Sequence, residues 1–567
     1  MLFILLWQLL AVLAVSAANP TQTTKRNNNG PASDFVTVRD GQFFVNGSSF
    51  RFVGTNAYWL HTLNTEQDID NTLANISAAG FTVVRTWAFN DVETIPENGT
   101  WFQLISNGTL TINDGPNGLQ KLDKVVELAK KHGLYVLLSL TNNWSPIPGI
   151  DVPAGFSPLE IKQLQAENRT SPRNSLSNDY GGMDVYVRNF GDIHEHDQFY
   201  INQTIVDAFK NYTSQIVSRY VNQSNVFGWE LANDPRCNST LPATPICQTT
   251  TVTQWHSDVA QHVKSVDPNH LVSSGNQGYF CADCPKLFPR VVTPPPQPSP
   301  APGSRRRRNL PEPLSKAKLL KERKAAWKQE RERKKRSGEH ADGVKIRGRW
   351  MSTKTRRQED LGVGSAFDGT HGVDSEDIIN IPQIGFGSFQ LFPNQYQYGP
   401  VDTSLPPFNQ TLQTGLDWIR RHADAARLFG KPVSLTGFGL VTANNSQSYV
   451  PFNTTVAPFG SDQAPAANTS QPFGITDAER DEAYRQWIEA GIEGGLQGII
   501  QYQWSQGNLT TQDGSPIAPL PDESGTTTNQ DSTGVSPNDG YGILGQGQQE
   551  VIDTIKSASQ GFAPDST

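Results

Sequence analysis

The stretch Gly118–Leu140, GLQKLDKVVELAKKHGLYVLLSL, joins an expected helix to an expected strand. Apolar residues recur at helical spacing over residues 118–132: Leu119, Leu122, Val126 and Ala129. Gly133 then ends the helix, because glycine adopts the left-handed backbone that stops one. The apolar run Leu134–Leu140 has the length of a strand that is buried on both faces. This order predicts a helix that returns the chain to the start of a parallel strand.

The same alternation of strand and helix continues along the chain from Phe50 onward. Eight apolar runs have the length of a strand: Phe50–Val53, Phe81–Trp87, Leu134–Leu140, Val226–Leu231, Leu271–Ser274, Ile384–Leu391, Val433–Phe438 and Gly498–Trp504. Strands separated by helices of about 10–15 residues form βαβ units and a parallel sheet. Eight such units predict an α/β fold, a closed (β/α)8 TIM barrel, whose active site would lie at the carboxyl ends of the strands.

Composition and charge set further bounds. The 567 residues are 36% hydrophobic and 18% charged, which excludes a coiled coil, a collagen-like repeat and a multi-span membrane protein. The formal net charge of -8 is unevenly distributed. Residues 305–357 contain 21 Lys and Arg against 6 Asp and Glu, a net +15, which leaves -23 for the rest of the chain. An acidic body is therefore interrupted by one basic block.

The basic block lies between the fifth and sixth expected strands, after the Pro-rich spacer 294–303. We interpret residues 291–365 as a disordered insertion, and a surface helix ending near Arg336 is an alternative for its middle part. Contact with nucleic acid, a hold on an anionic cell-wall polymer and proteolytic cleavage at its basic runs are possible roles. Nucleic-acid binding is not favoured, because Trp327 is the only aromatic residue between the spacer and Trp350.

The N-terminus predicts secretion. Residues 2–15 form an apolar run followed by Ser16-Ala17-Ala18, the pattern of a signal peptide over residues 1–18, although a buried N-terminal helix is the alternative. Residues 19–34 would be a leader, in which Lys25-Arg26 is either a propeptide cleavage site or part of an unfolded segment. No later run is long enough to span a bilayer, so we expect no membrane contact in the mature form.

Two further patterns suit an extracellular protein. The chain contains fifteen Asn-x-Ser/Thr sites for N-glycosylation. Its four cysteines form two local pairs, Cys237/Cys247 and Cys281/Cys284, which predict short-loop disulfides in an oxidising compartment. Their spacing without a nearby His is a poor match to a zinc site, so we expect no metal. The expected parts of the chain are a signal peptide (1–18), a leader (19–34), the first part of the barrel (35–290), the insertion (291–365), and the remaining barrel with a C-terminal tail (366–567).

Aromatic, amide and charged residues follow the expected strands at their carboxyl ends: Arg85, Trp87, Asn143, Trp144, Asn233, Asp234, Tyr502 and Trp504. Indole faces stack on the C–H faces of sugars, and amides and Arg bond sugar hydroxyls. The set therefore favours a carbohydrate site, although any one of these residues could simply pack the barrel loops.

Five motifs connect these strand ends to a known family: RTWAFND, NNW, WELAN-x-PRC, GFGSF-x-L and KPV-x-L-x-x-FG. Together they resemble glycoside hydrolase family 5, and most closely its fungal secreted endo-β-1,4-mannanases, from about Phe35 to Phe562. The resemblance implies a retaining hydrolase of a mannan-like polysaccharide that needs no cofactor. It further implies a general acid/base Glu at the end of the fourth strand and a nucleophilic Glu at the end of the seventh.

The sequence departs from the family pattern at its chemistry. Arg85 and Asn233 match, but the acid/base position is Asp234 and the nucleophile position is Gly437. Four other expected site residues are also replaced, and the residues found instead are Gln277, Gln390, Phe392 and Tyr502. A retaining glycosidase needs two carboxyl groups about 5–5.5 Å apart. Glycine supplies none.

Two main hypotheses follow. The first is a secreted mannanase-like hydrolase, and the second is a catalytically inactive glycan-binding protein that keeps the cleft. A third is a cell-wall protein attached to an anionic polymer through the basic insertion. We interpret Glu230 as a buried barrel residue bonded to its neighbours rather than as a replacement base. We expect a monomer whose partner is a polysaccharide and not a nucleic acid.

Overall fold

The computed structural model describes residues 34–146, 174, 176–190, 194–290, 310–336, 343–346, 349–352, 363–399, 405–454, 472–512, 515, 517 and 534–562. The expected signal peptide, most of the leader and the Pro-rich spacer lie outside these residues. Disulfides join Cys237 to Cys247 and Cys281 to Cys284, which confirms both predicted pairs.

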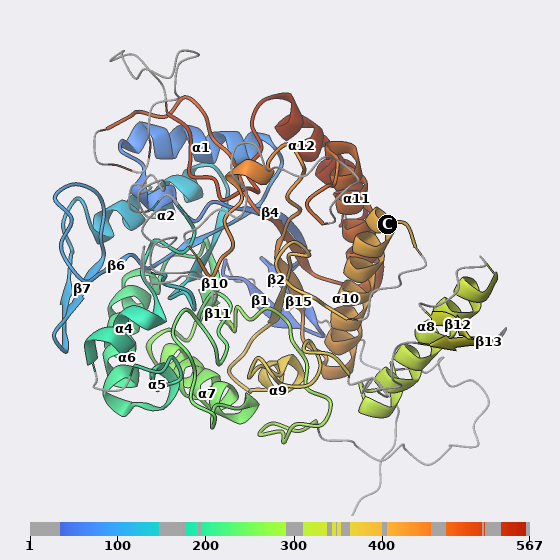
Figure 1. The fold of residues 1–567 in the computed structure, drawn as a ribbon. Helices are drawn as coiled ribbons and strands as arrows, with labels where there is room; N and C mark the ends of the chain where they lie inside the picture. The colour runs from blue at the N-terminus through green and yellow to red at the C-terminus, as the bar shows by residue number, and fades with distance from the viewer. Residues whose placement is uncertain are drawn as a thin grey trace, which may run out of the picture.

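Eight parallel strands form the centre of the molecule (Figure 1). They are β4 (Phe52–Asn56), β5 (Val83–Trp87), β9 (Tyr135–Ser139), β10 (Val226–Glu230), β11 (Leu271–Ser273), β14 (Gly387–Leu391), β15 (Val433–Phe438) and β16 (Gly498–Gln501). Each falls within or overlaps one predicted run. A parallel bridge between Ser273 and Phe386 joins the two outermost strands, so the sheet closes into the predicted barrel.

Helices surround the barrel and return the chain between its strands (Figure 1). They include α1 (Glu66–Ala78), α2 (Leu119–Lys131), α6 (Gln203–Tyr220), α7 (Thr249–Val266), α9 (Ser375–Ile379), α10 (Pro407–Phe429), α11 (Asp477–Gly494) and α12 (Gln546–Ser559). The helix and strand predicted for Gly118–Leu140 are both present: α2 ends at Lys131, and Gly133 has a φ of +71° before β9 begins. In α11, Thr476 and Glu479 form a reciprocal cap that fixes where the helix starts.

Smaller elements cover the two ends of the barrel. They are β1 (Thr37–Arg39), β2 (Gln42–Val45), β3 (Ser48–Phe50), β6 (Asp91–Val92), β7 (Gln103–Ser106), β8 (Thr109–Ile112), α4 (Met183–Phe190), α5 (Gln198–Ile201), and the short 3-10 turns at Leu60–Thr62, Ser446–Ser448 and Gln560–Phe562. Phe43 of β2 packs against Phe52, Phe227 and Phe386 near the starts of three barrel strands. This aromatic plug closes the amino-terminal end and leaves the opposite end for a site.

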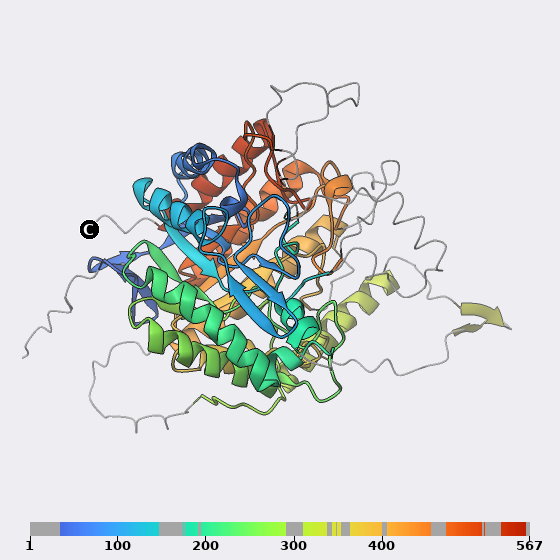
Figure 2. The same ribbon diagram turned by 90° about the vertical axis from the view of Figure 1, so that its left-hand side faces the viewer.

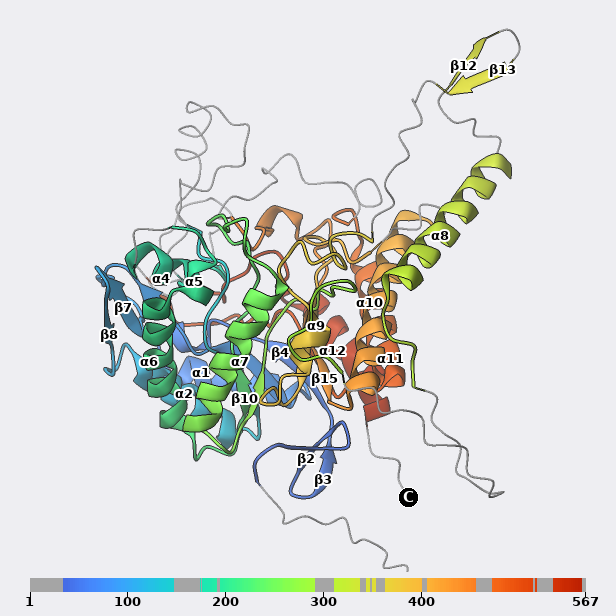
Figure 3. The same cartoon turned by 90° about the horizontal axis from the view of Figure 1, so that it is seen from below.

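The insertion contains one long helix, α8 (Lys316–Arg336), and a hairpin of β12 (Gly343–Ile346) and β13 (Arg349–Ser352). The surface helix ending at Arg336, left open by the sequence, is therefore present. Figures 2 and 3 show α8 extending away from the barrel, with the hairpin beyond it. After the insertion, the chain returns over both disulfides, and the backbone N–H of Cys237 donates to the carbonyl of His371 at 2.9 Å.

Candidate active site

The ends of β5 and β10 hold a buried charged network inside the barrel. Arg85 donates through Nε to both carboxylate oxygens of Glu230, at 3.1 and 3.2 Å, and through Nη2 to Asn233 Oδ1 at 2.8 Å. Glu230 has no exposed surface, so its charge is balanced by Arg85 and not by water. This geometry agrees with the interpretation of Glu230 as a barrel residue bonded to its neighbours.

Asp234, at the expected acid/base position, is a buried carboxylate with four donors around it. Arg236 contacts both of its oxygens, with Nε 3.1 Å from Oδ1. The Trp144 indole N–H donates to Oδ2 at 3.1 Å, and the Tyr396 hydroxyl donates to the same oxygen at 3.4 Å. Burial raises the pKa of Asp234 above its ordinary value, while Arg236 beside it opposes the shift. The carboxyl is therefore present but held in an ion pair.

Arg236 is a site residue that sequence reasoning did not select. Its guanidinium lies over three aromatic rings, at 5.1 Å from the centroid of Trp144, 5.2 Å from Tyr279 and 4.7 Å from Tyr396. Aromatic faces attract a cation, so these rings hold the guanidinium against Asp234. The Arg of the motif WELAN-x-PRC was the available signal, but only the structure shows that it pairs with a carboxylate two residues away.

Gly437 lies on β15, paired in register with Gln390 on β14. A Cβ placed on Gly437 would lie 3.2 Å from Phe392 Cζ and 3.7 Å from Gln390 Cγ. The first distance is shorter than ordinary van der Waals contact, so a side chain here requires Phe392 to move. Gln390 is itself held, because its Nε2 donates to Asn233 Oδ1 at 3.0 Å. Gln390 and Phe392 thus lie beside Gly437.

Phe392 belongs to an aromatic cluster at the ends of β14 and β16. Its ring centroid lies 5.2 Å from Phe452, 5.4 Å from Tyr502 and 5.4 Å from Tyr541. Tyr502 also packs against Phe452 and Tyr541, at 5.7 and 5.4 Å. Each ring is therefore restrained by the others, and moving Phe392 to admit a side chain at Gly437 would disturb the whole cluster.

A carboxylate lies behind this cluster, although sequence reasoning did not select it. The Tyr502 hydroxyl donates to Asp539 Oδ2 at 2.7 Å, and Ser177 Oγ donates to the same oxygen at 2.9 Å. Burial raises the pKa of Asp539 to about 6. Asp539 follows the last barrel strand by a long loop, so no strand pattern marks it.

Three other predicted residues have structural partners. Gln277 Nε2 donates to the Tyr398 hydroxyl at 2.7 Å, and that hydroxyl accepts from the Phe392 backbone N–H at 2.8 Å. Asn143 Oδ1 accepts from the Arg236 backbone N–H at 3.2 Å, which ties the third strand end to the fourth. Trp87 donates to the Ser177 carbonyl at 3.1 Å. The first two contacts link neighbouring strand ends, and the third links the end of β5 to the segment before α4.

Trp504 lies apart from this group. Its indole N–H donates to Gln506 at 3.3 Å, and its ring packs edge-on against Phe81 with centroids 6.0 Å apart.

Most of the predicted site residues are at least nine-tenths buried, and Asn233 is the half-buried exception. The structure therefore brings together the ends of β5, β9, β10, β14 and β16 as expected, in a closely packed arrangement.

The family profile for cellulase, glycosyl hydrolase family 5, matches residues 45–457. The chain belongs to glycoside hydrolase family 5. Its curated relatives include mannan endo-1,4-beta-mannosidase A of Aspergillus aculeatus, 35% identical over 271 residues, or 48% of this chain and 60% of that protein. Another is mannan endo-1,4-beta-mannosidase A of Hypocrea jecorina, 38% identical over 248 residues, or 44% of this chain and 47% of that protein.

The match to these relatives is partial, since the chain spans between 47% and 60% of their length. Among solved structures, the endo-1,4-beta-mannanase from Rhizomucor miehei superimposes with a TM-score of 0.55 at 23% identity, covering 93% of this chain and 99% of that one. That likeness confirms the family 5 barrel fold. The mannanase-like resemblance read from the strand-end motifs is therefore confirmed at the level of the family.

The chemistry open to this family 5 site follows from its carboxyl groups. Covalent catalysis in a retaining glycosidase needs a nucleophilic carboxylate opposite the acid. Position 437 offers none, Asp234 and Glu230 are each paired with an arginine, and Asp539 accepts hydrogen bonds from Tyr502 and Ser177. Within the described ranges, no cluster of three or more His, Cys, Asp or Glu residues is arranged to hold a metal ion. Across the same ranges, no helix has the length and apolar character of a membrane span.

Proposed function

We propose that this chain is a secreted family 5 protein that binds β-1,4-mannan or a related β-glycan without cleaving it by the retaining route. One observation supports the loss of hydrolysis above all others. Position 437 is a glycine, and Phe392 lies 3.2 Å from where its Cβ would be. Glycine carries no carboxylate, and a side chain placed at this position would need Phe392 to shift.

The family relationship supports the choice of ligand. The matched relatives are named as mannan endo-1,4-beta-mannosidases, and the motifs shared with that group lie at the strand ends. Asn233, the one half-buried residue of the predicted set, is the residue that we expect to contact the sugar, since amides bond hydroxyls; the buried Arg85 holds it by donating to its Oδ1. The N-terminal signal pattern over residues 1–18 supports secretion.

Hydrolysis of the same polymer is the second candidate, and Asp234 is the observation that favours it. Its carboxyl stands at the acid/base position, and burial raises its pKa, which favours the protonated form that a general acid needs. Cleavage would then require a water molecule and a base in place of the covalent step. Glu230 is already ion-paired with Arg85, and Asp234 with Arg236.

Affinity electrophoresis tests the binding half of the proposal. We expect the purified full chain to be retarded in gels containing soluble β-1,4-mannan and to run freely in gels without polysaccharide. The variant Arg85→Lys keeps the positive charge against Glu230 but loses the planar fork that reaches Asn233. We therefore expect it to be retarded less than the wild type. Absence of retardation in mannan and in every other β-glycan gel would contradict glycan binding, whatever the result for hydrolysis.

A further inference from the structure

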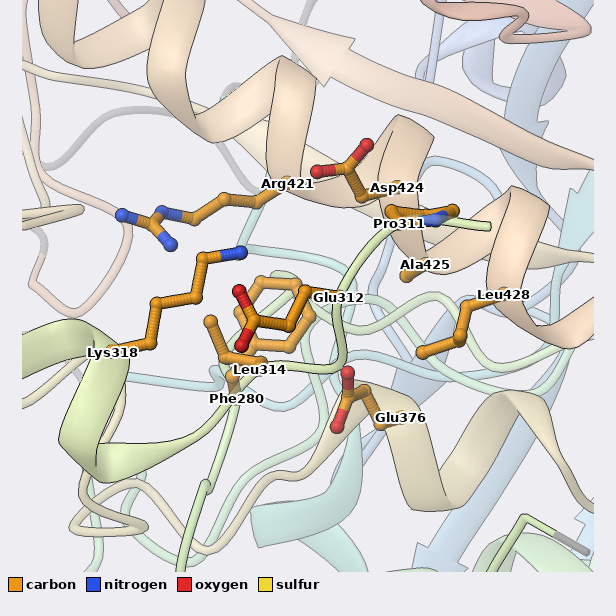
Figure 4. Close-up of a pocket in the computed structure, with 10 residues that line it drawn as sticks. All are labelled: Phe280, Pro311, Glu312, Leu314, Lys318, Glu376, Arg421, Asp424, Ala425 and Leu428. Carbon is orange, nitrogen blue, oxygen red and sulfur yellow. The ribbon is translucent and has the colours of Figure 1, made fainter. Parts of the chain in front are cut away.

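The start of the basic helix α8 is anchored to the barrel. Leu319 is 5% exposed and belongs to the barrel core, against which Leu314 and Leu320 also pack. Figure 4 shows the pocket at this contact, with Pro311, Glu312, Leu314 and Lys318 of the insertion facing Arg421, Asp424, Ala425 and Leu428 of α10, above Phe280 and Glu376. The insertion is therefore attached here by apolar contacts.

Two ion pairs fix the orientation of the helix at this root. Glu322 accepts from Arg421 of α10 at 2.7 Å, and Lys316 lies 2.7 Å from Asp283, next to the Cys281–Cys284 disulfide. Leu319 and Glu322 are three residues apart and share one face of a helix. This face is the one turned toward the barrel.

The opposite face presents a row of lysines. Each residue turns a helix by about 100°. Lys321 comes two positions after Leu319, and Lys324 two positions after Glu322, so each lysine lies about 200° around the helix from that residue. Lys321, Lys324 and Lys328 are all exposed, and their spacing of three and four residues places them in one line. The sequence continues the same spacing with Arg331 and Lys335. We call Lys321, Lys324 and Lys328 the lysine stripe.

We propose that the lysine stripe binds an anionic polysaccharide. The helix contains 11 Lys and Arg against 3 Glu, whereas the chain outside residues 305–357 has a net charge of -23. An acidic polymer is therefore attracted to α8 and repelled by the barrel. Positions three or four residues apart advance by about 5 Å along a helix. That step is comparable with the length of one sugar ring, so a polymer with one acidic group per ring meets one lysine per group.

Two other polyanions fit the stripe less well. A membrane-surface helix buries an apolar face beneath its basic one, but at the root of α8 the face opposite the lysines carries Leu319 and Glu322 and is packed on the barrel. Duplex DNA has one negative charge per about 1.7 Å, far denser than the stripe, and single-stranded nucleic acid is bound through stacked aromatics. The stripe offers only lysines, which act as point charges and provide no aromatic ring for a base to stack on.

Binding of the full chain to polygalacturonate, followed by isothermal titration at several salt concentrations, tests this proposal. We expect affinity to fall steadily with salt, because each ammonium that contacts the polymer releases counterions. The variant Lys321→Glu/Lys324→Glu/Lys328→Glu should lose about tenfold or more of the affinity. The matched control, Lys130→Glu/Lys131→Glu/Lys556→Glu, changes the net charge equally at exposed positions on α2 and α12 and should keep the affinity.

Circular dichroism and the melting temperature confirm that both triple variants fold. Equal affinity of the stripe variant and the wild type, or no binding by the wild type, would overturn the proposal. Tighter binding to single-stranded DNA or to anionic vesicles than to polygalacturonate would also overturn it. Neutral β-1,4-mannan, titrated in parallel, separates this result from binding at the barrel, which the stripe variant should leave unchanged.

Discussion

At the scale of single residues, the site is defined by a glycine and the phenylalanine beside it. We place the family's nucleophile at Gly437, which has no side chain, and Phe392 lies beside it within a cluster of aromatic rings. Gln390 pairs with the glycine from the neighbouring strand, and Phe392, just beyond the end of that strand, places its ring beside it. Restoring one carboxylate would therefore leave the other replacements in its way.

The first prediction concerns the space at Gly437. Gly437→Gln has nearly the shape of the family's Glu without its charge, and we expect it to lower the free energy of unfolding by about 1–3 kcal/mol through overpacking. Phe392→Ala in the same chain should offset part of this loss, with a favourable coupling of about 1 kcal/mol in a double-mutant cycle measured by urea unfolding. Strictly additive effects would show that the two positions do not compete for space.

The second prediction concerns the ion pair of Asp234 and Arg236. Asp234→Asn leaves a buried guanidinium without its counter-charge, so we expect a loss of about 3–5 kcal/mol in urea unfolding. The matched control is Asp417→Asn on α10, where the partner Arg420 is exposed and the loss should be at most about 1 kcal/mol. A small loss at Asp234 would mean that water or another group compensates Arg236.

At the scale of elements, the strands were predictable and their contacts were not. Continuous apolar runs such as Leu134–Leu140 mark strands buried on both faces, and Gly133 marks the end of the helix before it. The pairing of Asp234 with Arg236 and the packing of Phe392 depend on side-chain directions that no spacing encodes. Asp539 was missed for a similar reason, because it enters the site from a loop.

The third prediction is a pH dependence at the contact of α9 with the root of α8. Burial raises the pKa of Glu376 from 4.5 to about 7. The folded state binds this proton more tightly than the unfolded chain does. Protonated Glu376 therefore stabilises the fold at pH 4, and this contribution is lost as the pH rises through about 7. Glu376→Gln should match the wild type at pH 4 and exceed it by about 1–3 kcal/mol at pH 8 in urea unfolding. A constant difference across this range would contradict the assignment to Glu376.

At the scale of the whole molecule, the protein is an acidic barrel to which a basic helix is attached by its N-terminal end. The charge division was readable from the sequence, because +15 is concentrated in residues 305–357. The attachment was not, since Leu319 is one apolar residue in a charged run and only its burial shows that the helix begins on the barrel. Helix α8 thus has a packed root and a projecting remainder.

The fourth prediction separates these two parts of the insertion. Replacing residues 325–360 with a Gly/Ser linker should change the melting temperature little, because the described side chains beyond the root are largely exposed. Extending the replacement to residues 310–360 removes Leu314 and Leu319 as well, and should cost about 2–5 kcal/mol. Both melting curves are measured by calorimetry. Equal stability of the two deletions would show that the root contributes nothing.

The most direct test of the account is the release of reducing ends from β-1,4-mannan by the purified full chain. We expect none above background, because glycine at position 437, where we place the family's nucleophile, supplies no carboxylate. The control, Asp234→Asn/Arg236→Gln, removes both charges of the buried pair and so leaves neither unpaired. Sustained release by the wild type that this variant abolishes would contradict the claim that the barrel no longer hydrolyses its glycan.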